Sequence, residues 1–216
     1  MHLEINSLEK LDPDRIAGVK SCTTLSLSES STDKIPDWIC HLPLLKSLTV
    51  TGTSIYQFPD DFTNLSDTLV ELVFTHNLLQ SIPPIISNFS RLVTCDFSNN
   101  DIVEIPDQIG GCTALQTLSI NDNKDLNKIS AKIGNLVNLK NFLANRCSLS
   151  QLPIDMKNNI SLTYLGLTSN KFATLPPCIM YMSSLEDLYL SNNLLPDVEI
   201  QLIKQVFGST IRHDLP

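Results

Sequence analysis

Six cysteines and four histidines are the side chains of this chain that could carry out the most chemistry. A catalytic cysteine or serine needs a histidine within hydrogen-bond reach, and a metal needs ligands at short, regular spacing. The histidines are scattered (His2, His41, His76 and His213), and no two cysteines form a C-x-x-C pair. A glycine-rich phosphate-binding loop is also missing from the sequence. We therefore predict no catalytic residue, no metal site and no cofactor.

Asparagine has the regular spacing that cysteine and histidine lack. Five of the 18 asparagines follow one another at intervals of 23, 23, 47 and 23 residues: Asn77, Asn100, Asn123, Asn170 and Asn193. A primary amide donates and accepts hydrogen bonds, so it can pair backbone N–H and C=O groups where a chain bends toward the interior. Amides at a fixed period therefore predict a hydrogen-bonded ladder that joins successive turns of a repeat.

Prolines and apolar residues follow the same period. Seven of the 12 prolines are separated by 23, 23, 24, 23, 47 and 23 residues: Pro13, Pro36, Pro59, Pro83, Pro106, Pro153 and Pro176. The resulting consensus is L-x-x-L-x-L-x-x-N-x-L-x-x-I-P-x-x-I-x-x-L-x-x. Its units begin at Cys22, Leu45, Leu69, Leu92, Leu115, Leu139, Leu162 and Leu185. A period of this length predicts a solenoid in which each unit packs on its neighbours.

Each part of the consensus predicts one structural element. The L-x-L segment alternates with period two, which is typical of a short strand with one buried face. Strands that recur once per turn must pair in parallel, because each turn returns to the same side. The I-P-x-x-I half predicts a short helical or extended return, since proline fixes φ and removes a donor.

This consensus resembles the leucine-rich repeat family over about residues 12 to 207. The I/L-P-x-x-I signature, as in Ile35-Pro36 and Leu175-Pro176, is similar to the intracellular subclass. That subclass includes Ras-pathway scaffold proteins and plant intracellular Ras-group-related proteins. The resemblance implies an α/β repeat solenoid, a right-handed horseshoe with a concave parallel β-sheet and with short helices or extended returns on its convex side. It also implies that the concave face binds other proteins.

The repeat pattern divides the chain into an N-terminal cap with half a repeat, eight repeats of 23–24 residues, and an exposed tail: 1–21, 22–207 and 208–216. The last repeat merges into a predicted capping helix at about 197–207, with Asp197 as its N-cap and Gly208 as its stop. We expect most apolar residues of this helix to be buried against the last turn. The tail could equally be a linker to a further segment.

Charge and composition exclude several functional classes. The net charge is −8, from 15 basic and 23 acidic residues, which argues against nucleic-acid binding. No run of 18 apolar residues exists, and the N-terminus lacks a basic segment followed by an apolar one, so we predict neither a membrane span nor a secretory signal. Most cysteines fall at apolar positions of the repeat, which predicts reduced, buried thiols. We therefore expect a cytosolic or nuclear setting, and take the cytoplasm as the localisation.

The remaining candidate for function is the concave face. The third, fifth and seventh residues of each unit face away from the core, and the eighth lies at the edge of the sheet. The predicted partner-binding residues come from these positions: Glu71, Val73, His76, Asp96, Asp122, Leu143, Arg146, Tyr164, Asp187 and Tyr189. The carboxylates give the face an acidic bias, opposed mainly by Arg146. Leu143, Tyr164 and Tyr189 lie in adjacent units and predict one apolar and aromatic patch.

Each of these two features has two interpretations. The tyrosines either pack as neighbouring strand residues, because aromatics suit strands, or form a binding hot spot. The acidic bias either maintains solubility or attracts a basic partner.

We predict a non-catalytic, monomeric scaffold or adaptor that binds another protein on its concave face in intracellular signalling. A partner with a basic surface, for example a small GTPase, a kinase or a phosphatase, would suit the acidic bias. The alternative is a regulatory or targeting domain of a larger signalling enzyme, because similar repeats occur joined to protein phosphatase and adenylyl cyclase domains. A third candidate is a self-associating structural protein.

Overall fold

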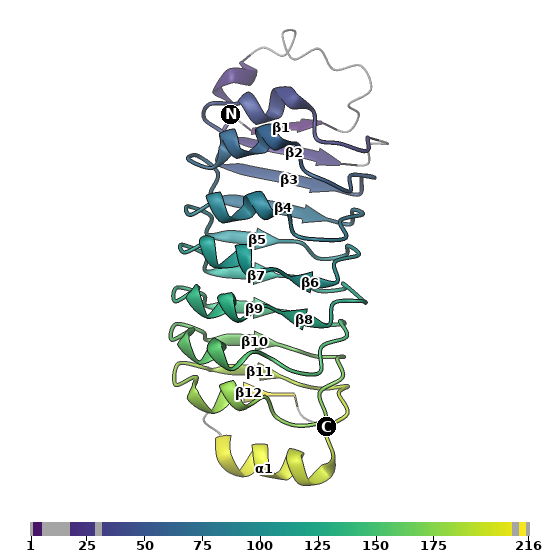
Figure 1. The fold of residues 1–216 in the computed structure, drawn as a ribbon, viewed down its shortest axis with the longest axis vertical. Helices are drawn as coiled ribbons and strands as arrows, with labels where there is room; N and C mark the ends of the chain where they lie inside the picture. Colours follow the sequence, from purple (N-terminus) through teal and green to yellow (C-terminus); the bar gives the residue numbers. More distant parts are fainter. Residues whose placement is uncertain (1, 6–17, 29–31, 209–211, 215–216) are drawn as a thin grey trace.

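The protein, seen in a computed structural model, is a stack of turns that each add one strand to a ten-stranded parallel sheet (Figure 1). The structure describes residues 2–5, 18–28, 32–208 and 212–214. The strands lie in sequence order from one end of the sheet to the other, β1-β2-β3-β4-β5-β7-β9-β10-β11-β12. The predicted parallel solenoid is therefore confirmed.

The strands are short, and those from β1 to β11 each bury one face. They are β1 (His2–Ile5), β2 (Thr24–Ser28), β3 (Ser47–Thr51), β4 (Glu71–Thr75), β5 (Thr94–Asp96), β7 (Thr117–Ser119), β9 (Asn141–Leu143), β10 (Tyr164–Gly166), β11 (Asp187–Tyr189) and β12 (Arg212–His213). In β4, for example, Leu72 and Phe74 are buried while Glu71 and Val73 are only partly covered. A second, two-stranded sheet joins β6 (Glu104–Ile105) to β8 (Lys128–Ile129).

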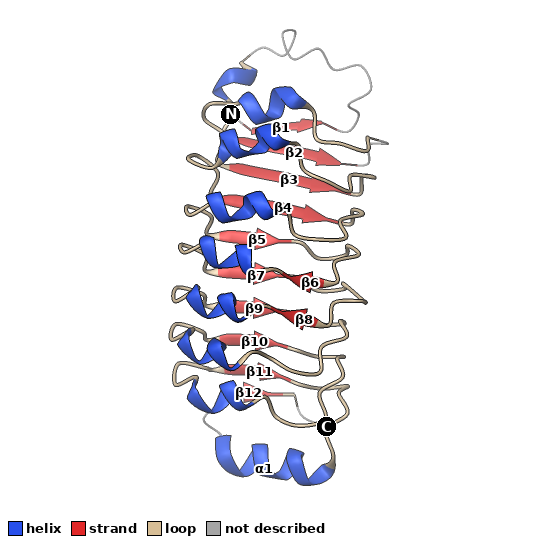
Figure 2. Ribbon diagram, in the orientation of Figure 1, coloured by secondary structure: helices blue, strands red, loops and turns tan. Residues whose placement is uncertain are grey.

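Short 3-10 helices form the opposite side of the stack (Figure 2). They are η2 (Val19–Ser21), η3 (Asp37–His41), η4 (Asp60–Leu65), η5 (Pro84–Asn88), η6 (Asp107–Gly111), η7 (Ala131–Asn135), η8 (Ile154–Asn158) and η9 (Pro177–Tyr181). From η3 onward, all except η7 follow the proline of their repeat, whose fixed φ and missing N–H suit a helix start. In η7, Ser130 takes the place of proline, and its side chain accepts the N–H of Lys132 at 3.0 Å.

The asparagine ladder is present inside the stack. The Oδ1 of Asn100 accepts the N–H of Leu79 at 3.0 Å, and its Nδ2 donates to the carbonyls of Phe74 (2.8 Å) and Phe97 (3.0 Å). Each amide therefore joins its own turn to the preceding one. Equivalent amides do the same in other turns: Asn77, Asn123, Asn170 and Asn193. Between the turns of Asn123 and Asn170, Cys147 takes the place of the asparagine, and its thiol donates to the Ile120 carbonyl at 3.4 Å.

The N-terminal end contains a strand that the sequence pattern did not predict. Strand β1 pairs in parallel with β2, and Leu3 and Ile5 lie opposite Leu25 and Leu27. Leu3 and Ile5 thus occupy the places of the two leucines in the L-x-L segment. Most of the predicted half repeat, residues 6–17, lies outside the described residues.

The C-terminal helix α1 spans Asp197–Phe207, as predicted. Its cap differs from the prediction, because Pro196 occupies the N-cap position and Asp197 belongs to the first turn without capping it. Proline suits this place since a helix start leaves N–H groups unpaired.

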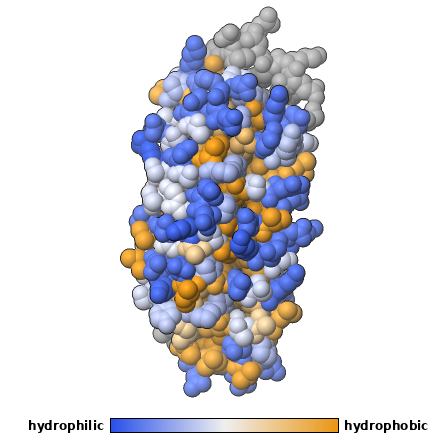
Figure 3. Space-filling model, viewed as in Figure 1, coloured by the Kyte–Doolittle hydropathy of each residue, from blue (hydrophilic) through white to orange (hydrophobic). Residues whose placement is uncertain are grey.

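The predicted burial of most apolar residues of α1 is wrong. Ile200 and Ile203 are buried, whereas Val198 is 73% exposed and Leu202 and Val206 are 48% and 44% exposed. An α-helix that lies against a single turn covers only one of its stripes, and the other apolar residues face outward. Figure 3 shows apolar residues gathered at the end of the molecule formed by α1.

Candidate protein-interaction surface

The predicted binding residues lie in two kinds of position. Most belong to strands β4, β5, β9, β10 and β11, with side chains on the face away from the core. His76, Asp122 and Arg146 instead lie in the turn after a strand, where φ is 55°, 58° and 53°. This left-handed conformation is uncommon outside glycine, and it recurs at this place in successive turns. These three side chains therefore line the edge of the sheet.

Two tyrosines are in contact on the concave face. The ring centroids of Tyr164 and Tyr189 are 5.1 Å apart, with a 34° angle between the planes. Gly166 lies opposite both Leu143 and Tyr189 in the sheet, and a Cβ atom there would come within 3.3 Å of the Tyr164 ring. Because Gly166 has no side chain, the Tyr164 ring reaches across toward Tyr189. We call Leu143, Tyr164 and Tyr189 the aromatic platform.

The environment of the platform is partly buried and negative. Burial raises the pKa of Tyr164, and the neighbouring Tyr189, Asp187 and Asp214 raise it further. Both effects disfavour the phenolate of Tyr164, so this side chain remains neutral at physiological pH. A neutral aromatic face beside carboxylates is suited to apolar contacts and to cations.

Two arginines neutralise carboxylates on this face. Arg146 donates from Nε and Nη2 to the two carboxylate oxygens of Asp122 at 2.5 and 2.6 Å, which raises the pKa of the arginine. Arg212 binds Asp187 with an Nε–Oδ1 distance of 2.7 Å. The predicted acidic bias is therefore weaker than the composition indicated, because Arg146 is joined by an arginine from the tail. Glu71 and Asp96 have no cationic partner among the described residues.

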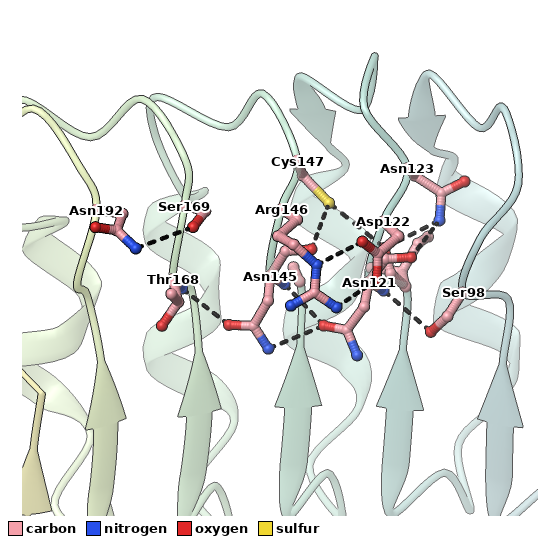
Figure 4. Close-up of polar contacts among 12 residues, drawn as sticks. Ser98, Asn121, Asp122, Asn123, Asn145, Arg146, Cys147, Thr168, Ser169 and Asn192 are labelled. Carbon is pink, nitrogen blue, oxygen red and sulfur yellow. Dashed lines mark hydrogen bonds and ion pairs between the residues drawn. The ribbon is translucent and has the colours of Figure 1, made fainter.

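A second hydrogen-bonded ladder runs along the concave edge (Figure 4). The Ser98 hydroxyl accepts the N–H of Asn121 at 3.2 Å, and Asn121 Oδ1 accepts the N–H of Asn145 at 2.8 Å. Asn145 Oδ1 in turn accepts the N–H of Thr168 at 2.8 Å. All four residues hold the seventh position of their units, which the repeat pattern places on the side away from the core. Two asparagines at the seventh position of adjacent units are the signal that could have predicted this ladder.

The tail ends this ladder and was predicted to be exposed. Strand β12 instead pairs with β11, and Asp214 Oδ1 accepts the N–H groups of Leu190 (2.6 Å) and Ser191 (3.0 Å). Asp214 Oδ2 also accepts from the hydroxyls of Thr168 and Ser191. The carboxylate thus satisfies donors that the last complete turn would leave unpaired.

Within the described residues, the cysteine side chains form no accessible reactive site. All six cysteines are buried and free. Burial raises the pKa of Cys40 and Cys112 to about 12 and that of Cys147 and Cys178 to about 11, so these thiols carry no nucleophilic thiolate at neutral pH. Within the described residues, no group of three potential metal ligands comes together. Among the residues that the structure describes, no helix has both the length and the apolar character that a membrane span requires.

Comparison with known proteins identifies the class. No protein-family model matches the chain. The adenylate cyclase of Schizosaccharomyces pombe is 30% identical over 201 residues, which are 93% of this chain but only 12% of that protein. A leucine-rich repeat protein of Leptospira interrogans has a TM-score of 0.80 at 24% identity, covering 98% of this chain and 53% of the other. The plant peptide hormone receptor RGFR1, in complex with RGF2, has a TM-score of 0.69 at 24% identity, over 91% of this chain and 32% of the receptor.

The repeat in the sequence, the asparagine ladder in the structure and the similarity to these proteins indicate the same class of protein. The chain is a leucine-rich repeat protein, a class whose fold is suited to binding other proteins.

Proposed function

We propose that the chain is a protein-interaction module that holds a partner protein on its concave face, with the aromatic platform as the main anchor. The observation that carries this proposal is the contact between Tyr164 and Tyr189 over Gly166. Tyrosine is enriched among residues that dominate binding energy, and these two rings are already held in place by the sheet. A platform ordered before binding loses little conformational entropy when the partner arrives.

A similar fold supports the choice of partner class. The solved structure of RGFR1 contains its ligand RGF2, and the receptor shares the solenoid of this chain. For the present chain we propose a partner with a basic segment, because Glu71 and Asp96 lack cationic partners among the described residues. We propose a monomeric adaptor in intracellular signalling, since six free, buried cysteines suit a reducing compartment.

Removing the platform tests the proposal. The double variant Tyr164→Ala/Tyr189→Ala and a control, Tyr56→Ala/Tyr181→Ala, are used to capture proteins from a cell extract, followed by mass spectrometry. The control tyrosines are 53% and 64% exposed, and Tyr181 lies on η9 on the opposite side of the stack. We expect a partner captured by the wild type and the control to be lost from the platform variant, with affinity lowered about tenfold or more. Equal capture by all three proteins would contradict the platform's role.

A second candidate function is a regulatory or targeting domain of a larger signalling enzyme. The similarity to adenylate cyclase over 93% of this chain and 12% of that protein favours it. Sequencing the complete transcript distinguishes the two. A stop codon soon after Pro216 supports the adaptor, and an open reading frame that continues into a catalytic domain supports the regulatory domain.

A further inference from the structure

Two carboxylates on the concave face keep oxygen atoms available for a ligand. Glu71 Oε2 accepts from the Ser47 hydroxyl at 2.7 Å, and Asp96 Oδ1 accepts the N–H of Ser98 at 2.9 Å. The second oxygen of each carboxylate has no hydrogen bond from the described residues. By contrast, arginines pair with Asp122 and Asp187. Glu71 and Asp96 lie on neighbouring strands, Asp96 opposite Val73.

The aromatic platform lies farther along the same face. From β5 to β10 the sheet advances by three strand intervals, and from β4 to β11 by five. At about 4.8 Å per interval, the carboxylates and the two tyrosines of the platform are about 14 to 24 Å apart. The face therefore carries a negative anchor and an apolar anchor at a fixed separation.

Polar side chains cover the sheet between the two anchors. Thr94 and Thr117 lie opposite each other on β5 and β7, and Asn141 on β9 donates to the Thr117 hydroxyl at 3.1 Å. Hydroxyl and amide groups pair well with backbone N–H and C=O groups, which an extended peptide exposes and a helix does not. The floor between the anchors thus favours an extended ligand.

We propose that the concave face binds an extended segment of a partner protein through both anchors. An arginine or lysine of the segment lies over Glu71 and Asp96, and an apolar or aromatic side chain lies on the aromatic platform. At about 3.3 Å per residue, these two side chains are about four to seven residues apart. This inference rests on the proposed function and adds the ligand's conformation, charge and spacing.

Selection from a random peptide library tests the spacing. Peptides about twelve residues long, displayed on phage, are long enough to span both anchors. We expect the wild-type protein to enrich peptides with a basic residue and an aromatic or large apolar residue at the stated separation. Enrichment of peptides without that pattern overturns the two-anchor model.

Measuring the affinity of one enriched peptide in synthetic, fluorescein-labelled form tests the negative anchor. We expect Glu71→Gln/Asp96→Asn to weaken binding about tenfold and to reduce its dependence on salt. The control Asp60→Asn/Asp67→Asn removes two exposed charges outside the concave strands and should change affinity less than about twofold. Melting curves of all variants confirm that the fold is retained.

The outcomes separate the two proposals. If Glu71→Gln/Asp96→Asn binds like its control while Tyr164→Ala/Tyr189→Ala loses the peptide, the two-anchor model fails and the proposed function stands. If neither double variant alters binding, or if no peptide is enriched, both proposals fail.

Discussion

The interior and the concave face of this sheet are built on the same strands but follow opposite rules. Inside, one residue type recurs at one position, and each amide bonds to the turn before it. On the concave face, the fifth position changes at every strand, as the register shows: Val73, Asp96, Ser119, Leu143, Gly166 and Tyr189. An interior side chain must satisfy the backbone of two turns, which leaves little choice. A concave side chain can be satisfied by solvent or by a partner protein, so its residue type can vary and can determine which partner binds.

The concave-edge ladder is intermediate between these two cases. Like the interior ladder it bonds from turn to turn, but its members are Ser98, Asn121, Asn145 and Thr168 rather than one residue type. Solvent can replace a lost bond at this partly buried edge, so the constraint on residue type is weaker. Substitutions in the interior, in the concave-edge ladder and at the Arg146 ion pair should therefore change the free energy of unfolding by different amounts.

The largest effect is expected inside. Asn100→Ala removes an amide that pairs the Leu79 N–H and the Phe74 and Phe97 carbonyls, all in the interior. Leaving such groups unpaired costs roughly 1–3 kcal/mol of the free energy of unfolding. Chemical denaturation measures this change, and an unaltered melting temperature would show that the ladder does not stabilise the stack.

A smaller effect is expected at the concave edge. Asn145→Ala removes the acceptor of the Thr168 N–H and the side-chain bond from Asn145 Nδ2 to Asn121, both partly buried. We expect a loss of about 0.5–1.5 kcal/mol, because water can take over these groups. If Asn145→Ala lowers the free energy of unfolding as much as Asn100→Ala in the same denaturation series, the two ladders do not differ in their contribution to stability.

The smallest effect is expected for Arg146→Gly. This change removes an exposed ion pair with Asp122, worth about 0–1 kcal/mol, but glycine readily adopts the φ of 53°. The two contributions nearly cancel, so the free energy of unfolding should change by less than about 0.5 kcal/mol. Arg146→Ala loses the pair without relieving the backbone and should be less stable than the glycine variant. The reverse order in urea denaturation would mean that the left-handed turn imposes no cost.

The repeat made much of the fold predictable. Strand positions, the proline-led returns and the ladder all follow from a period that recurs throughout the sequence, whereas the span of α1 was predicted from Asp197 and Gly208 at its ends. Strand β1 was not predicted because residues 2–5 form a single strand at the end of the stack, where no further copy confirms the pattern. The same holds for β12, which pairs with β11 although it lacks the consensus leucines.

The candidate surface was only partly predictable. The repeat pattern placed Leu143, Tyr164 and Tyr189 in adjacent units, and the structure adds that the two tyrosine rings are in contact over Gly166. The role of these residues in binding stays a prediction. The charge balance was misjudged because the pairing of β12 with β11 was not predicted, and this pairing brings the exposed Arg212 to Asp187.

The sequence by itself determined the interior of this protein, since a repeated pattern of leucine, asparagine and proline allows only one way to bury its apolar residues and pair its backbone. The tertiary structure decided the contacts on the surface. Arg146 meets Asp122, Arg212 meets Asp187, and Tyr164 leans toward Tyr189 rather than straight across the strand. These partners are about one repeat apart in sequence, and their side chains have several orientations available. Only the packing of neighbouring turns selects one of them.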